Sequence, residues 1–87
     1  MTVYMVERNL KGIPMSDLAA AQKAAIGTAQ AYTAKGTPVR YIRSTFAPED
    51  GRCMCLFEAA SAADVKTLND EAKLPYSRIV EALDLTP

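Results

Sequence analysis

The order in which two kinds of hydrophobic spacing follow one another along the chain constrains its fold more than any other feature. Two segments carry apolar residues at helical spacing, one after Ser16 and one after Ser61. Four other segments show the alternation and β-favouring residues that are typical of strands, namely Thr2–Arg8, Thr37–Phe46, Arg52–Ala59 and Arg78–Leu85. The chain is therefore predicted to run strand, helix, strand, strand, helix, strand.

Capping and turn residues support this division. Ser16 is predicted to cap the first helix, whose inner face is formed largely by alanines. Ser61 and Asp64 form a capping-box pair at the start of the second helix, and Pro75 stops that helix. Residues 48–51, Pro-Glu-Asp-Gly, are typical of a turn, so the two middle strands are predicted to form a hairpin.

This order of elements defines the predicted fold class. It is the split βαβ arrangement of the α+β, ferredoxin-like fold, in which right-handed crossovers place both helices on one face of a four-stranded antiparallel sheet. The sequence shows no repeat of fixed period, no linker and no low-complexity tract. Residues 1–87 are therefore predicted to form a single domain.

Strand alternation divides the sheet side chains into two sets. The set predicted to face the helices is almost wholly apolar: Val6, Ile42, Met54, Leu56, Val80 and Ala82. The set predicted on the open face is apolar with several reactive groups: Met5, Glu7, Val39, Tyr41, Arg43, Cys53, Cys55, Phe57, Ile79, Glu81 and Leu83. Because an apolar patch of this kind marks an interface or a ligand site, we expect a homodimer, an α/β-barrel-type assembly whose paired sheets enclose a cavity.

Charge patterning excludes several classes of partner. The 10 basic and 10 acidic residues cancel and form no run, so nucleic acid and membrane surfaces are not expected to bind. No apolar stretch reaches membrane-spanning length, and the first ten residues do not resemble a signal peptide. The two cysteines lie on one strand and point to the same side, so both thiols are expected to be free, as in the reducing cytoplasm.

The cysteines also suggest a metal site. Cys53 and Cys55 would present two soft sulfur ligands, and Glu7 or Asp70 would add oxygen, a mixture suited to nickel or zinc. The alternative is that both cysteines pack as small hydrophobic side chains.

Glu7, Tyr41 and Arg43 are the candidate catalytic residues if the chain is an enzyme. An enclosed Glu7 would serve as a base, while Tyr41 and Arg43 would orient a carbonyl substrate. The alternatives are an internal ion pair for Glu7, with Arg43 or Arg8, and core packing for Tyr41. Catalytic sites that need histidine are excluded because the chain has none, and no Gly-rich loop supports a nucleotide cofactor.

Several short motifs resemble those of a known family. They are Tyr4-Met5-Val6-Glu7-Arg8, Tyr41-Ile42-Arg43-Ser44, Cys55-Leu56-Phe57-Glu58-Ala59, and Leu74-Pro75 with Arg78-Ile79. Together they resemble the small ferredoxin-like proteins typified by a bacterial nickel-binding protein. The resemblance implies a dimer and, in some relatives, a metal site that includes the strand cysteine, here Cys55. Relatives often carry a histidine before the Leu-Pro element, where this chain has Leu68, Asn69 and Asp70.

Two functions follow from these patterns. The first is a dimeric protein that binds a metal, nickel or another divalent transition metal by resemblance, or a small organic ligand. The second is a cofactor-independent enzyme of the isomerase, cyclase or monooxygenase type, acting on a small organic substrate in the cavity at the sheet face. An interaction protein with a packed interface and no cavity is the third alternative.

Overall fold

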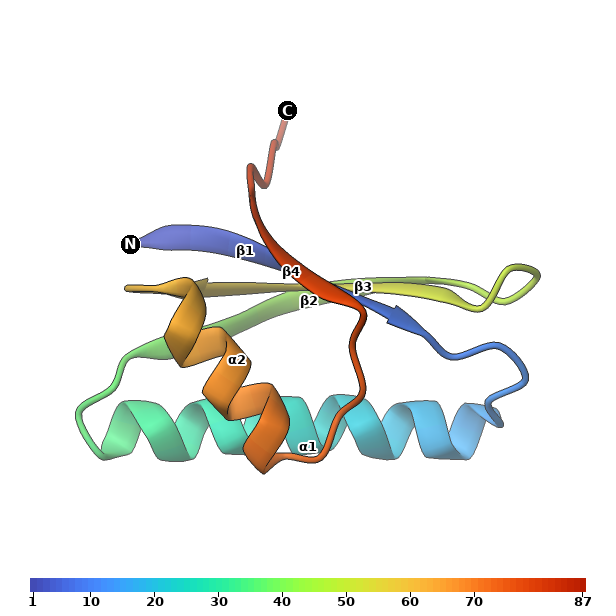
Figure 1. Ribbon diagram of the computed structural model, residues 1–87, viewed down its shortest axis with the longest axis horizontal. Coiled ribbons are helices and arrows are strands. Elements are labelled where there is room, and N and C mark those ends of the chain that lie inside the picture. Colours follow the sequence, from blue (N-terminus) through green and yellow to red (C-terminus); the bar gives the residue numbers. More distant parts are fainter.

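The computed structural model describes residues 1–87 and contains the six predicted elements in the predicted order (Figure 1). Strand β3 has the predicted bounds, whereas β4 ends three residues before the predicted Leu85. The bounds are β1 Thr2–Asn9, α1 Met15–Ala34, β2 Val39–Ala47, β3 Arg52–Ala59, α2 Ala62–Glu71 and β4 Arg78–Ala82.

The sheet has the strand order β2-β3-β1-β4, and every neighbouring pair is antiparallel. Both helices lie on one side of it, and the residues after β4 leave the sheet on the other side (Figure 1). The predicted α+β ferredoxin-like fold is confirmed. No helix in this fold has the combination of length and hydrophobicity that a membrane span requires.

The helix ends follow local chemistry. Helix α1 begins at Met15 after Pro14, earlier than the predicted Ser16 cap, and Pro14 makes no side-chain cap bond. Proline suits this position because it has no N–H to satisfy and its φ is fixed near the helical value. At α2 the cap is as predicted, since the Asp64 N–H donates to Ser61 Oγ at 3.2 Å.

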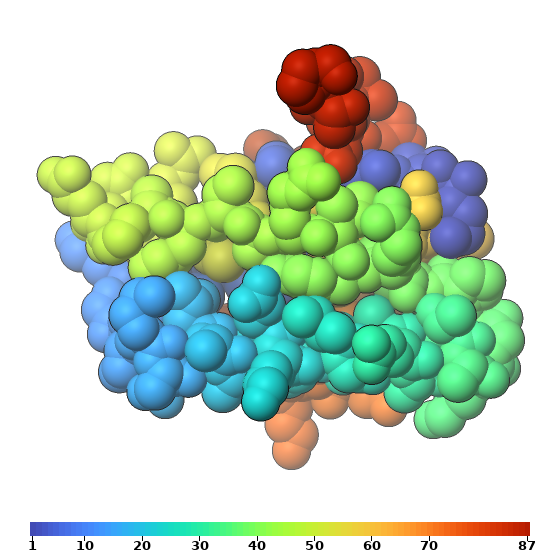
Figure 2. Space-filling model, turned by 180° about the vertical axis from the view of Figure 1, so that it is seen from behind, coloured from blue at the N-terminus to red at the C-terminus, as the bar shows by residue number.

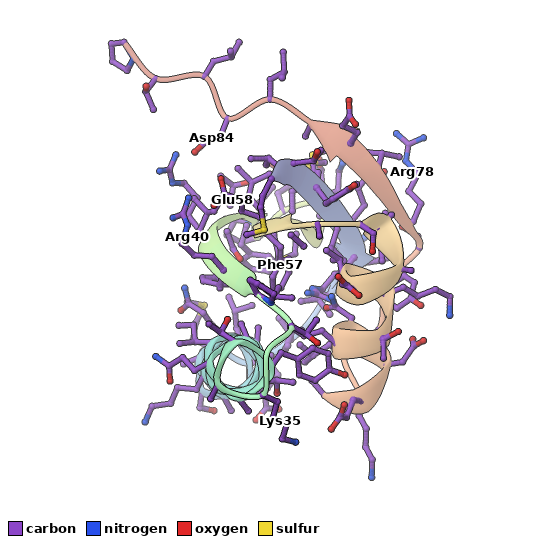
Figure 3. All side chains as sticks on the ribbon, turned by 90° about the vertical axis from the view of Figure 1, so that its left-hand side faces the viewer. Lys35, Arg40, Phe57, Glu58, Arg78 and Asp84 are labelled. Carbon is purple, nitrogen blue, oxygen red and sulfur yellow. The ribbon has the colours of Figure 1, made fainter.

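The predicted assignment of the two sheet faces is wrong for β3 and β4. It is also wrong for Val39 and Tyr41 of β2, which pair with the buried Ala59 and Phe57 and lie on the helix side. Figure 3 shows Phe57 pointing from β3 toward the helices, where it is fully buried. Met54 and Leu56 lie on the open face instead, and Val80 joins them because it pairs with Met5 of β1. The buried apolar cluster is formed by Val6, Ala25, Ala29, Val39, Cys53, Cys55, Phe57, Ala59, Val65 and Leu68.

A β-bulge explains part of this error. Tyr41 pairs with Phe57, whereas Arg43 pairs with Leu56, so Ile42 is an extra residue in β2. A bulge shifts the alternation by one residue, and Tyr41 and Arg43 therefore point to opposite faces although they are two positions apart. The rest of the error arises because both faces carry apolar side chains. Hydrophobicity alone therefore does not show which alternate residues of a strand face the helices.

The outer surface shows how closely the two layers pack. In Figure 2, α1 runs alongside β2 across the molecule, and the C-terminal segment projects from the body. At the β2–β3 hairpin, Gly51 is buried against the loop before α1, and its carbonyl accepts the Leu10 N–H at 2.7 Å. Gly51 has a φ of +78°, and a side chain there would overlap the Lys11 backbone, so glycine is required.

Candidate functional site

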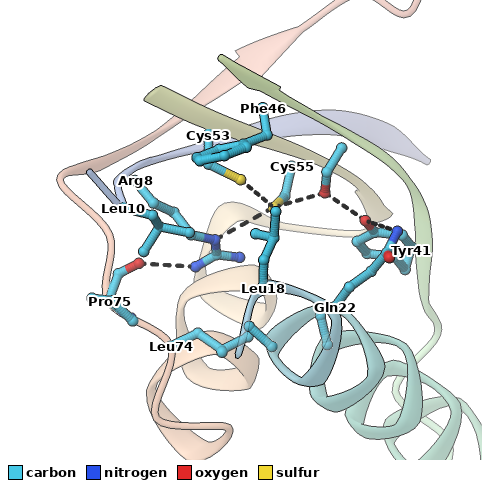
Figure 4. Close-up of a pocket in the computed structure, with 13 residues that line it drawn as sticks. Arg8, Leu10, Leu18, Gln22, Tyr41, Phe46, Cys53, Cys55, Leu74 and Pro75 are labelled. Atoms are coloured by element: carbon cyan, nitrogen blue, oxygen red, sulfur yellow. Dashed lines mark hydrogen bonds between the residues drawn. The ribbon is translucent and has the colours of Figure 1, made fainter. Parts of the chain in front are cut away.

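A cavity of about 150 Å³ lies between the sheet and α1 (Figure 4). Nine of its 13 lining residues are hydrophobic, and Arg8 is the only charged one. The lining residues are Arg8, Leu10, Leu18, Ala21, Gln22, Ala25, Tyr41, Ser44, Phe46, Cys53, Cys55, Leu74 and Pro75. The site thus combines apolar walls with a small group of polar atoms, as small-molecule sites commonly do.

Arg8 is the central polar residue of the cavity. It points to the helix side of β1, two positions after Val6, and is only 6% exposed. Its Nη2 donates to Asn69 Oδ1 at 2.7 Å, its Nη1 to the Pro75 carbonyl at 3.1 Å and its Nε to Cys55 Sγ at 3.4 Å. Asn69 is itself fully buried and is fixed by donating to the Val65 carbonyl at 2.8 Å.

None of these partners of Arg8 is an acid. The four ion pairs of the chain use other basic residues, namely Arg40, Arg43, Lys66 and Arg78. A buried charge is normally paired, because removing an ion from water costs several kcal/mol. Arg8 is therefore a buried cation that neutral dipoles stabilise and that has no countercharge in the chain.

A chain of hydrogen bonds continues across the cavity from Cys55. Ser44 Oγ donates to Cys55 Sγ at 2.9 Å and is hydrogen bonded to the Tyr41 hydroxyl at 2.5 Å (Figure 4). Gln22 Nε2 donates to the same hydroxyl at 3.1 Å. These contacts fix the wall opposite Arg8 with polar groups that carry no charge.

The second thiol lies beside the first. Cys53 Sγ is 3.9 Å from Cys55 Sγ, and both thiols are free and buried. Burial and, to a lesser extent, the neighbouring Cys55 together raise the pKa of Cys53 to about 11. Cys53 is therefore a neutral thiol at physiological pH.

The predicted catalytic residues do not come together. Tyr41 lines the cavity, but Glu7 and Arg43 lie on the open face of the sheet. There Glu7 pairs with Arg78, and Arg43 pairs with Asp84 at 2.8 Å. Glu7 does form an ion pair, but the pair is exposed and its partner is Arg78, so the predicted internal pair with Arg43 or Arg8 does not form. Within one chain, Glu7, Tyr41 and Arg43 cannot act on the same substrate.

The predicted metal ligands are separated by the same sheet. Cys53 and Cys55 face the helices, whereas Glu7 pairs with Met54 and faces away from them. No three histidine, cysteine or acidic side chains of the chain form a group that could hold a metal ion. The prediction that Glu7 completes a site with the two cysteines is wrong for a single chain, because alternate strand residues point to opposite faces.

Sequence reasoning missed Arg8 and Asn69 as site residues. Arg8 follows Val6 by two positions, so the alternation of β1 already places this charged side chain on the core face. A charged residue at a core position is an informative signal. Asn69 gives no comparable local signal, because its role depends on the approach of α2 to β1.

Fold and site together define a class of protein, the small ferredoxin-like proteins with a cavity between helices and sheet. A family model described as nickel responsive protein SCO4226-like matches residues 4–82, and the chain belongs to this family. Its fold is also similar to the crystal structure of SCO4226 from Streptomyces coelicolor A3(2), with a TM-score of 0.78 and 23% identity over 98% of this chain and 99% of that one. Among curated proteins, none matches this chain.

Proposed function

We propose that this protein binds a small organic molecule in the cavity between α1 and the sheet. The observation that carries the proposal is the mainly apolar cavity with a single charged residue, Arg8, in its wall. Binding sites for small molecules typically have apolar walls and a few fixed polar groups that orient the ligand. Cys55, Ser44 and Tyr41 supply such groups, and their mutual hydrogen bonds hold them in place.

The cavity volume limits the size of the ligand. An engineered apolar cavity of about 150 Å³ is known to hold benzene, and the cavity here has about the same volume. The expected occupant is therefore a molecule with one ring or a short branched chain. The edge-to-face packing of Tyr41 on Phe57, with ring centroids 5.4 Å apart, makes one wall rigid.

Nickel, which the family name suggests, does not fit this set of ligands. Two thiols and one hydroxyl lie close together, but burial raises the pKa of Cys53 and so disfavours the thiolate that a metal requires. Arg8 also places a positive charge 3.4 Å from Cys55 Sγ, which opposes a divalent cation. We therefore prefer an organic ligand to a metal ion for this cavity.

Ligand binding can be tested with a panel of single-ring compounds: toluene, benzyl alcohol, benzamide and benzoate. We expect at least one of them to raise the melting temperature and to give saturable binding by titration calorimetry, because a ligand that binds only the folded state stabilises it. An Ala21→Leu variant, which fills the cavity from α1, should lose this binding.

The matched control is Ala20→Leu, the same substitution at an exposed position next to it on α1. Ala20→Leu should bind the compounds as the unmodified chain does. The proposal is contradicted if no compound in the panel binds, or if Ala21→Leu binds as well as the control.

We also propose that a second copy of the chain covers the open face of the sheet. This face carries Met5, Met54, Leu56 and Val80, and the exposed Leu83 and Leu85 follow it. Basic and acidic groups alternate along it, since Arg40 lies beside Glu58 (Figure 3) and Arg43 forms an ion pair with Asp84. Two copies related by a two-fold axis can therefore match opposite charges.

Sedimentation equilibrium tests this assembly. We expect a mass of about twice the 9.4 kDa chain and the single-chain mass for Leu56→Glu, which places a charge in the apolar face. A single-chain mass for the unmodified protein at all concentrations would show that the face is not a dimer interface.

A further inference from the structure

We propose that Arg8 makes the cavity selective for a small organic acid, whose carboxylate binds the guanidinium while its ring-sized apolar body fills the cavity. This inference rests on the proposed ligand-binding function and names the chemical class of the ligand. The observation behind it is that Arg8 is 6% exposed, lines the cavity and has no acidic partner.

The hydrogen-bonding capacity of Arg8 leaves room for a carboxylate. A guanidinium has five N–H groups, and three of them donate to Asn69, Pro75 and Cys55. The two others, one on Nη1 and one on Nη2, have no partner in the chain. A carboxylate accepts from two guanidinium N–H groups at once, in the geometry that makes arginine the preferred partner for this group.

The charge balance favours a monoanion. Arg8 is the only charged residue that lines the cavity, and no aspartate or glutamate is among the other lining residues. One carboxylate would neutralise its single positive charge. A phosphate or sulfate group would fill only the polar end and leave the leucine, alanine and phenylalanine walls without contact, so an acid with an apolar body fits better.

The order of the polar groups gives the ligand a direction. Asn69 and the Pro75 carbonyl hold two guanidinium nitrogens from the side of α2 and the segment that follows it. Tyr41 and Gln22 lie on the opposite side of Cys55 (Figure 4), and Ser44 is hydrogen bonded to both Cys55 and Tyr41. The carboxylate is therefore placed at the β1 end of the cavity, with the ring directed toward Leu18 and Phe46.

The first test compares benzoate with benzamide, which has nearly the same shape but no charge, on the unmodified protein. We expect benzoate to bind about tenfold to a hundredfold more tightly, the difference typical of a hydrogen bond to a charged group. Equal affinities would overturn this inference while leaving the proposed ligand-binding function intact. If neither these two compounds nor any other compound of the panel binds, both this inference and the proposed ligand-binding function are overturned.

The second test uses variants of the arginine. Arg8→Met should bind benzoate no more tightly than it binds benzamide. Arg8→Lys should keep part of the preference for benzoate, because it retains the positive charge but not the planar guanidinium that binds a carboxylate through two N–H groups. Arg40→Met is the matched control, because it removes the same charge from an exposed position outside the cavity and should bind benzoate normally. If Arg8→Met does not fold, the comparison of the two ligands on the unmodified protein still decides the matter.

Discussion

Replacing Phe57 with alanine is expected to lower the free energy of unfolding by about 3–5 kcal/mol, the usual cost of removing a buried aromatic ring. Phe57 is fully buried on the central strand β3, where it pairs with Tyr4 on one side and Tyr41 on the other. Its edge-to-face contact with Tyr41 is lost as well. Because a domain of this size has about 5–15 kcal/mol of total stability, urea denaturation should show a large decrease in midpoint.

Phe46→Ala is the matched control for this prediction. It removes the same ring from β2 at a position that is only partly buried. The transfer and cavity costs both scale with the apolar surface that becomes exposed, so its loss of stability should be clearly smaller. Equal losses in the two variants would contradict the assignment of Phe57 to the centre of the core.

The fold could be predicted from the sequence because each element has a local signal. The Ser61 cap, the turn before Gly51 and the alternation from Arg52 to Ala59 all lie within a few residues of the structure they produce. The end of β4 was harder to predict. The alternation of Leu83 and Leu85 continues the strand pattern, but the ladder ends at Ala82, which pairs with Val3 near the start of β1.

The site was harder to predict than the fold for a physical reason. Tyr41, Cys53 and Cys55 are candidate site residues on sequence grounds, and all three line the cavity. The prediction that they lie on the same face as Glu7 is wrong. It depends on which alternate residues of each strand face the helices, and the bulge at Ile42 and the apolar character of both faces hide this from the sequence. The contact between Arg8 and Asn69 joins residues 61 positions apart and depends on how α2 packs.

Replacing Asn69 with leucine is expected to lower the free energy of unfolding by about 2–3 kcal/mol, the upper part of the range for a hydrogen bond to a charged group. Leucine has a similar volume and keeps the packing, but the Arg8 Nη2–H that now donates to Asn69 Oδ1 at 2.7 Å would lose its acceptor in a buried position. The same variant should weaken benzoate binding, because the guanidinium would no longer be held in one orientation. Urea denaturation and calorimetric titration measure the two effects.

A double-mutant cycle distinguishes this interaction from simple packing. If Asn69 acts through Arg8, the variant that combines Arg8→Met and Asn69→Leu should lose less stability than the sum of the two single losses, since replacing both buried polar partners by apolar groups removes the unsatisfied charge. We expect a coupling of about 1–3 kcal/mol, within the range for residues in contact. Gln30→Leu, an exposed change of the same kind on α1, should alter stability by no more than about 0.5 kcal/mol. Strict additivity of the Arg8 and Asn69 effects would show that Asn69 stabilises the protein independently of the guanidinium.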